Sequence, residues 1–186
     1  ASEANVESNG WVYNCLKGDT SRSAGQFPIA ADGLSVVVKK GGAADICING
    51  MGGLTTDQVR WIYSDYNAAE LVATGWDSMA LPNSDNNDAT HLWSELDVTC
   101  PSAEIKIAGA DSESGTYEFF MDAMLSDAEN GEIFDSNRPD GYTNSAEDEV
   151  VVNYLESNDD SIGYFGYAYY KANQDKLTAV AIKNDA

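Results

Sequence analysis

The residues best suited to bind an anion are Ser114-Gly115-Thr116, a short run that combines two hydroxyls with a glycine. Isoleucines alternate with polar neighbours over residues 103–108, which predicts a short strand just before the run. After the run, apolar residues recur at helical spacing, namely Tyr117, Phe120, Met121, Met124 and Leu125. The run therefore begins a helix, where unpaired N–H groups, two hydroxyls and the positive end of the helix dipole favour an anion.

Two other roles compete for the same residues. Serine and threonine at the start of a helix are usually N-caps, which is the simpler interpretation. An enzyme with Ser114 as its nucleophile would need a base, and His91 is the only histidine, in a loop-rich region. Neither flank of Ser114 fits Gly-x-Ser-x-Gly, and the lysine of a nucleotide-binding P-loop is absent. We therefore expect no catalytic residues and no enzyme.

Composition limits the partners. The 186 residues suit one domain or one large lobe of something bigger, and the 43% hydrophobic content is enough for a core. The net charge is −21, from 31 acidic and 10 basic residues, which disfavours nucleic acid and anionic membranes. No apolar run is long enough to cross a bilayer, so direct membrane insertion is not expected.

The three cysteines, Cys15, Cys47 and Cys100, have no CxxC spacing, and with a single histidine they do not predict a zinc site. One disulfide with one remaining cysteine indicates an extracytoplasmic protein, whereas three buried thiols are the alternative. Residues 82–88 alternate Asp and Asn as in calcium loops but lack the required glycine and distal glutamate, so a plain surface loop is expected. We expect neither a metal nor a cofactor.

Strand and helix signals alternate along the chain, which predicts an α/β fold with a mixed or mostly parallel central sheet flanked by helices. Residues 1–26 are expected to be a polar N-terminal segment, with at most a short helix that ends at Gly18. Strands are expected at 34–38, 162–166 and 177–182, and helices after capping boxes at Thr55 and Ser145 and from Tyr167. Residues 39–44 are expected to form a loop.

The chain resembles the periplasmic phosphate-binding proteins of phosphate ABC transporters, which have a two-lobed type II periplasmic-binding-protein fold. The most specific matching parts are the Ser-Gly-Thr turn and the run Gly-Tyr-Phe-Gly-Tyr-Ala-Tyr-Tyr at 163–170. The match extends over roughly residues 27–182. Its other segments are 32–38, 54–62, 93–96, 145–148 and 176–180.

The resemblance implies that Ser114, Gly115 and Thr116 bind phosphate through hydroxyls and backbone N–H groups. Many members carry an arginine where this chain has Ala110, while one branch lacks it and carries an acid just before the serine. Glu113 fits that branch, although aspartate is commoner there. A carboxylate can accept the proton that phosphate carries and sulfate lacks. Ser145 and Glu147 align with a segment near the cleft.

The sequence lacks two features of the family. We find no Gly-Ser-Ser-Thr turn of the kind that supplies ligands from the first lobe, and the chain stops near Ile182, where the family returns to that lobe. We therefore expect residues 27–186 to be only the second lobe. The implied function is phosphate binding in an ABC-type uptake system, with a permease or a first lobe as partner. The alternative is a non-catalytic structural or interaction module of a larger extracytoplasmic assembly.

The same topology suggests a disulfide. If the strand at 104–108 runs toward the cleft, the strand at 34–38 should run away from it. Cys47 follows the strand at 34–38, and Cys100 precedes the strand at 104–108. Both cysteines should therefore lie at the end distal to the cleft. We expect a Cys47–Cys100 bond, with Cys15 free or paired to a group outside this chain.

Overall fold

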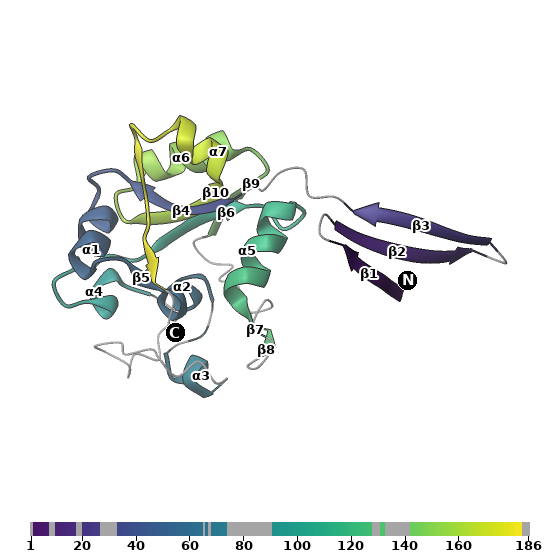
Figure 1. Ribbon diagram of the computed structural model, residues 1–186. Coiled ribbons are helices and arrows are strands. Elements are labelled where there is room, and N and C mark those ends of the chain that lie inside the picture. The colour runs from purple at the N-terminus through teal and green to yellow at the C-terminus, as the bar shows by residue number, and fades with distance from the viewer. Residues whose placement is uncertain are drawn as a thin grey trace. The chain divides into compact units, whose positions relative to one another are not determined.

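The computed structural model describes residues 2–7, 10–17, 20–26, 33–64, 66, 68–73, 91–127, 131–132 and 142–183. The chain divides into two compact units, Ala1–Asp32 and Gly33–Ala186 (Figure 1).

The first unit is a three-stranded antiparallel sheet in the order β1-β2-β3. Its strands are β1 (Ser2–Glu7), β2 (Gly10–Lys17) and β3 (Thr20–Gln26). The short helix expected before Gly18 is wrong, because those residues form β2. The strand pairs with β3 from Trp11↔Gln26 to Lys17↔Thr20, so its backbone groups are satisfied across strands rather than along a helix. The β-forming types of Trp11, Val12 and Tyr13 favour this outcome.

The second unit, called the lobe below, is built on a five-stranded mixed sheet in the order β11-β4-β10-β6-β9. Strands β10, β6 and β9 are parallel to one another, and β4 runs antiparallel to its neighbours β10 and β11. The mixed α/β architecture agrees with the sequence expectation. The strands are β4 (Leu34–Lys39), β6 (Lys106–Ala110), β9 (Tyr142–Ser145), β10 (Ser161–Gly166) and β11 (Leu177–Ala179).

Helices cover both faces of this sheet (Figure 1). Strand β4 is buried on both faces, because Val36 and Val38 belong to one buried cluster and Val37 belongs to another. Both faces of such a strand need to be covered by helices. Helices α6 and α7 pack on the Val37 side, and α1, α2 and α5 pack on the other. The helices are α1 (Ala43–Met51), α2 (Thr56–Tyr63), α3 (Ala68–Ala73), α4 (Trp93–Leu96), α5 (Gly115–Leu125), α6 (Asp148–Ser157) and α7 (Tyr167–Ala172).

Short strand pairs complete the lobe: β5 (Leu54–Thr55) pairs in parallel with β12 (Ile182–Lys183), and β7 (Ser126–Asp127) pairs with β8 (Gly131–Glu132).

The capping box at the start of α2 forms as the sequence predicts. Thr55 Oγ1 accepts a hydrogen bond from the Gln58 N–H at 3.1 Å, and Gln58 Oε1 accepts one from the Thr55 N–H at 2.9 Å. The same helix holds a largely buried ion pair between Asp57 and Arg60, one turn apart. Arg60 also donates through Nε to the Met124 carbonyl at 2.7 Å. Arg60 therefore ties α2 to the end of α5.

Three other expectations need correction. The loop expected at 39–44 gives way to α1 from Ala43, because the Ala44 N–H is satisfied by the Asp159 carbonyl. The capping box expected at Ser145 is wrong, because α6 begins only after Glu147, which has no side-chain cap. The closing strand expected at 177–182 is divided into β11 and β12, because the Ala181 carbonyl bonds to the Leu54 N–H of β5 instead of continuing along β4. The calcium alternative at 82–88 lies outside the described residues.

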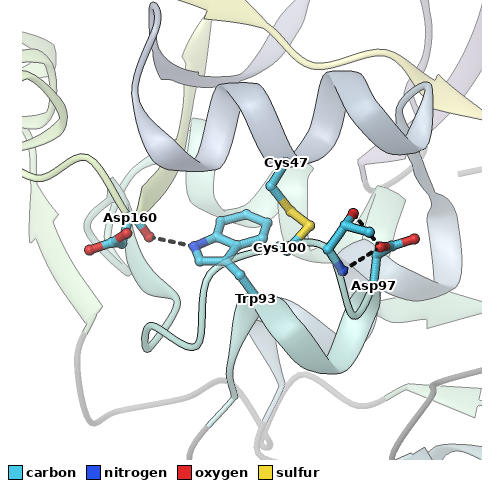
Figure 2. The surroundings of a disulfide bond; sticks show 6 residues. Cys47, Trp93, Asp97, Cys100 and Asp160 are labelled. Atoms are coloured by element: carbon cyan, nitrogen blue, oxygen red, sulfur yellow. Dashed lines mark hydrogen bonds between the residues drawn. A yellow bond between two sulfur atoms is a disulfide. The ribbon is translucent and has the colours of Figure 1, made fainter.

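A disulfide joins Cys47 of α1 to Cys100, which follows α4, with a Cα–Cα distance of 5.1 Å (Figure 2). This is the pairing expected from the strand directions. The indole of Trp93 lies beside it, fully buried, and donates through Nε1 to the Asp160 carbonyl at 2.9 Å. Asp97 accepts from both the N–H and the hydroxyl of Thr99, which lowers the pKa of Asp97.

Candidate anion-binding site

The Ser114 turn and the segment at 145–147 lie together at one edge of the sheet. We call this the carboxyl edge, because the parallel strands β6, β9 and β10 all end there. Ala110, the last residue of β6, is the register partner of Ser145, the last residue of β9. The two segments that hold the sequence-predicted residues therefore leave adjacent strands at the same end of the sheet, which is where open α/β sheets bind ligands.

Hydrogen bonds within the turn fix its shape. Asp111 Oδ1 accepts from the Glu113 N–H at 2.9 Å, and the Asp111 carbonyl accepts from the Ser114 N–H at 3.1 Å. Ser114 Oγ accepts from the Tyr117 N–H at 3.1 Å, three residues on. Ser114 is thus the N-cap of α5, so the structural role holds for its hydroxyl oxygen, while its hydroxyl proton still has a donor role to fill.

The first two N–H groups of α5 are left for a ligand. Within the described residues, the N–H groups of Gly115 and Thr116 have no hydrogen-bond acceptor. Gly115 is exposed, and a Cβ placed on it would meet nothing within 4 Å. It lies in a surface hollow that Ser112 and Glu118 also line. Two backbone donors without an acceptor therefore lie at the start of α5, next in sequence to the half-buried hydroxyls of Ser114 and Thr116, and such a helix start can bind an oxyanion.

The other predicted ligands, Glu113, Ser145 and Glu147, are described by their exposure and by one hydrogen bond. Glu113 and Glu147 are exposed, and Ser145 is half-buried. Ser145 Oγ accepts from the Glu147 N–H at 3.0 Å, so the hydroxyl closes a local turn instead of capping α6. Burial, followed by the charge of Glu147, raises the pKa of Asp148, the first residue of α6. The carboxyl edge is thus rich in carboxylates near Ser145.

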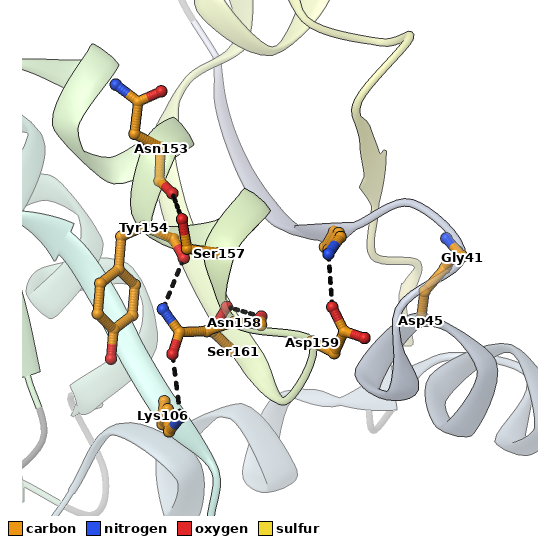
Figure 3. Close-up of polar contacts among 10 residues, drawn as sticks. Gly41, Asp45, Lys106, Asn153, Tyr154, Ser157, Asn158, Asp159 and Ser161 are labelled. Carbon is orange, nitrogen blue, oxygen red and sulfur yellow. Dashed lines mark hydrogen bonds and ion pairs between the residues drawn. The ribbon is translucent and has the colours of Figure 1, made fainter.

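Acidic side chains gather at the carboxyl edge, and the nearest lysines of β4 and β6 are at the other end of these strands. The described carboxyl edge carries acidic side chains in the turn and the first turns of α5 and α6: Asp111, Glu113, Glu118, Glu147, Asp148 and Glu149. Lys106 and Lys39 lie at the opposite edge, where Lys106 donates to Asn158 at 3.0 Å and Lys39 pairs with Asp159 (Figure 3). An anion at the Ser114 turn would therefore be held by backbone dipoles and hydroxyls, without help from these lysines.

His91 is a core residue that does not reach Ser114. Its ring is 2% exposed and packs edge-on against Trp61 at 4.1 Å between centroids. The His91 carbonyl accepts from the Ile105 N–H, which places this histidine before the start of β6, whereas Ser114 follows its end. The geometry gives Ser114 no histidine base. Within the described residues, no three His, Cys, Asp or Glu side chains are grouped as a metal site.

Sequence reasoning missed a pair of phenols beneath the turn. Tyr142 donates its hydroxyl proton to the Ala110 carbonyl at 2.5 Å, and the Tyr142 and Tyr164 hydroxyl oxygens are 2.8 Å apart. Desolvation by burial is the main cause that raises the pKa of both phenols well above the usual range. The only signal in the sequence was Gly109 inside a strand, a position where glycine often marks a close approach.

The chain is similar in sequence to phosphate-binding proteins. No family model matches the chain. It is 28% identical over 161 residues to the phosphate-binding protein PstS of Staphylococcus saprophyticus, covering 87% of this chain and 38% of that protein. It is 30% identical over 160 residues to PstS of Staphylococcus haemolyticus, covering 86% and 38%. The chain spans about two fifths of the length of the curated relatives it matches.

Solved structures share the fold of the lobe. A possible phosphate-binding protein from Planctomyces limnophilus superposes with a TM-score of 0.57 at 29% identity, covering 82% of this chain and 42% of that one. PstS from Borrelia burgdorferi gives a TM-score of 0.52 at 19% identity, covering 82% and 47%. The α/β lobe described above is therefore a part of the fold of these proteins.

Proposed function

We propose that this chain, a partial relative of the PstS phosphate-binding proteins, binds inorganic phosphate at the Ser114–Thr116 turn as part of a solute-binding protein for phosphate uptake. The observation that carries the proposal is the pair of N–H groups at Gly115 and Thr116, which have no acceptor within the described residues and belong to the helix start that Ser114 caps. The relatives are named as phosphate-binding proteins, which supports binding over the structural-module alternative and supports a non-enzymatic role.

Glu113 is proposed as the acceptor of a phosphate proton, and Ser145 and Glu147 as outer contacts at the same edge. The strand register supports this grouping, since Ala110, the last residue of β6 before the Ser114 turn, is paired with Ser145. The exposure of Glu113 and Glu147 means that both carboxylates are hydrated when no ligand is bound. A bound phosphate must therefore displace water from them, which limits their contribution to affinity.

The lobe alone should bind weakly. About three charge-assisted hydrogen bonds, each worth roughly 1.5–3 kcal/mol when buried, are available at the turn. An open, solvated site retains only part of this, and association has its own entropic cost. A millimolar dissociation constant corresponds to about 4 kcal/mol. We therefore expect millimolar or weaker binding by this lobe, and tighter binding if a first lobe closes on the same anion.

We place the protein outside the cytoplasm, with a membrane permease as partner. The Cys47–Cys100 disulfide supports this location, because such bonds persist in oxidising compartments. Across the described residues, no helix combines the length and the apolar character that crossing a membrane requires.

Titration with inorganic phosphate, followed by calorimetry and by the amide resonances of Gly115 and Thr116, tests the proposal. Thr116→Val removes a hydroxyl while keeping the shape, and should weaken binding severalfold. Thr99→Val is the matched control, because Thr99 lies next to the disulfide, and binding should not change. Saturating shifts confined to other residues, or equal effects of the two variants, would contradict the site.

A further inference from the structure

The end of β6 is held differently from the rest of the strand. Its pairing with β10 extends only to Ala108, opposite Gly163, while its pairing with β9 continues to Ala110. At Ala110, the last residue before the turn, the carbonyl accepts from the Tyr142 hydroxyl. A side chain from β9 thus supports the last carbonyl of the strand from which the Ser114 turn departs.

Gly109 makes room for this contact. A Cβ on Gly109 would lie 2.3 Å from Tyr164 Cε1 and 2.8 Å from the Tyr142 hydroxyl oxygen. Both phenols therefore lie against the backbone of β6, in the space that any other residue at this position would fill. The glycine and the two tyrosines form one packed unit directly before the turn.

Helix α5, which follows the turn, packs against Tyr164 of the same unit. The Tyr164 ring stacks on Phe120 of α5 with 3.8 Å between centroids and 8° between planes. Tyr63 of α2 contacts both rings edge-on, at 4.8 Å from Phe120 and 5.7 Å from Tyr164. The three rings are at most 1% exposed. Tyr164 thus links the packing of α5 to the hydrogen bond at the end of β6.

The direction of the hydrogen bonds follows from counting protons. Tyr142 has one hydroxyl proton, and it is donated to the Ala110 carbonyl. The proton in the 2.8 Å contact between the phenols must then come from Tyr164. The order is Tyr164 to Tyr142 to Ala110, and both phenols are protonated at physiological pH, as phenols ordinarily are.

We propose that Tyr142 and Tyr164 are positioning residues for the anion site, which hold the strand end and the helix start so that the N–H groups of Gly115 and Thr116 converge. The effect on ligand affinity rests on the proposed phosphate binding. The positioning itself does not, since it concerns the geometry of the unliganded turn.

Hydrogen exchange of the turn amides tests the positioning without a ligand. Tyr142→Phe removes the donor to Ala110, and should speed exchange of the Ser114 and Tyr117 amides by tenfold or more. Tyr164→Phe keeps that donor and also keeps the ring that stacks on Phe120, so it should change them less than threefold. Tyr169→Phe, which removes the hydroxyl of a half-buried phenol bonded to Glu149, is the matched control and should have no effect.

The control amide is that of Gln58, which bonds to Thr55 in the cap of α2 and should be unchanged in all variants. A rise at Gln58 equal to that at the turn means general destabilisation and overturns the proposal. In the unmodified chain, the Tyr142 hydroxyl proton should be visible as a slowly exchanging resonance close to Ala110. Its absence would also overturn the proposal, even if a variant does not fold.

Phosphate titration separates the two proposals. If the unmodified chain binds, Tyr142→Phe should weaken binding three- to tenfold and Tyr164→Phe less than twofold. Equal affinities for Tyr142→Phe and the unmodified chain would overturn the positioning. If the unmodified chain does not bind phosphate, the proposed function fails, while the exchange experiment still decides the positioning.

Discussion

Gly109→Ala is the substitution whose cost can be worked out most directly from the structure. Carbon atoms pack at about 3.5–4.0 Å, whereas the new methyl would lie 2.3 Å from Tyr164 Cε1 and 2.6 Å from Cζ. The overlap exceeds 1 Å by this comparison. No positive φ is involved, so backbone strain adds nothing to the steric effect. The cost depends on whether the Tyr164 ring can move away.

The surroundings prevent that movement. The Tyr164 ring is fully buried and lies against Phe120, and its hydroxyl is bonded to Tyr142. Overpacking costs about 1–3 kcal/mol, and occasionally more, so we expect about 3 kcal/mol here. For a protein of this size, a loss of 1 kcal/mol lowers Tm by about 2–4 °C. Gly109→Ala should therefore lower Tm by roughly 6–12 °C.

Urea unfolding followed by circular dichroism measures this loss. Gly115→Ala is the matched control, because a methyl there meets nothing within 4 Å, and it should leave the free energy of unfolding unchanged or slightly higher. Gly109→Ala combined with Tyr164→Leu should cost less than the sum of the single changes, since the shorter side chain relieves the overlap. A Gly109→Ala protein as stable as its parent would refute the close packing of the phenols on β6.

Three further predictions concern the rest of the lobe. Replacing Cys47 and Cys100 together by alanine should lower the free energy of unfolding by about 4 kcal/mol, the chain-entropy value for a separation of 53 residues, and an unchanged urea midpoint would contradict it. Arg60→Met should cost about 3 kcal/mol, because it leaves a buried aspartate in α2 without its ion pair, and equal stability would contradict that pair. The hydrogen bond to Glu149, more than burial, raises the pKa of Tyr169 to about 12, so its contribution to stability is present below pH 10 and is lost as pH rises through 12. Glu149→Gln should return the pKa of Tyr169 toward 10, which absorbance titration against a Tyr169→Phe control would detect.

Features that depend on neighbouring residues could be predicted from the sequence. The capping box of Thr55 and Gln58 needs only four consecutive residues, and it forms as expected. The buried strand at 34–38 follows from a β-branched run, and the structure has it as β4. The start of α5 after Ser114 follows from residue types and periodicity together.

Features that depend on distant contacts could not be predicted in this way. Ser145 has the spacing of a capping box, but it is the last residue of β9 and is paired with Ala110 of β6, and its hydroxyl accepts from the Glu147 N–H instead. The polar residues before Gly18 form β2 because two partner strands satisfy its backbone. The contact of Tyr142 with Ala110 joins residues 32 apart and leaves only Gly109 as a trace in the sequence.

The disulfide between Cys47 and Cys100 determines what happens when a protease cleaves the backbone between them. It closes residues 47–100 into a covalent ring that contains α2, α3 and α4. A single backbone cut anywhere inside that ring leaves the two pieces joined through sulfur, so a nicked protein still migrates as one molecule until a reductant is added. Helix α1 and the segment that leads into β6 would then stay attached to each other after the cut. The persistence of a nicked lobe is therefore set by the redox potential around it as much as by its folding.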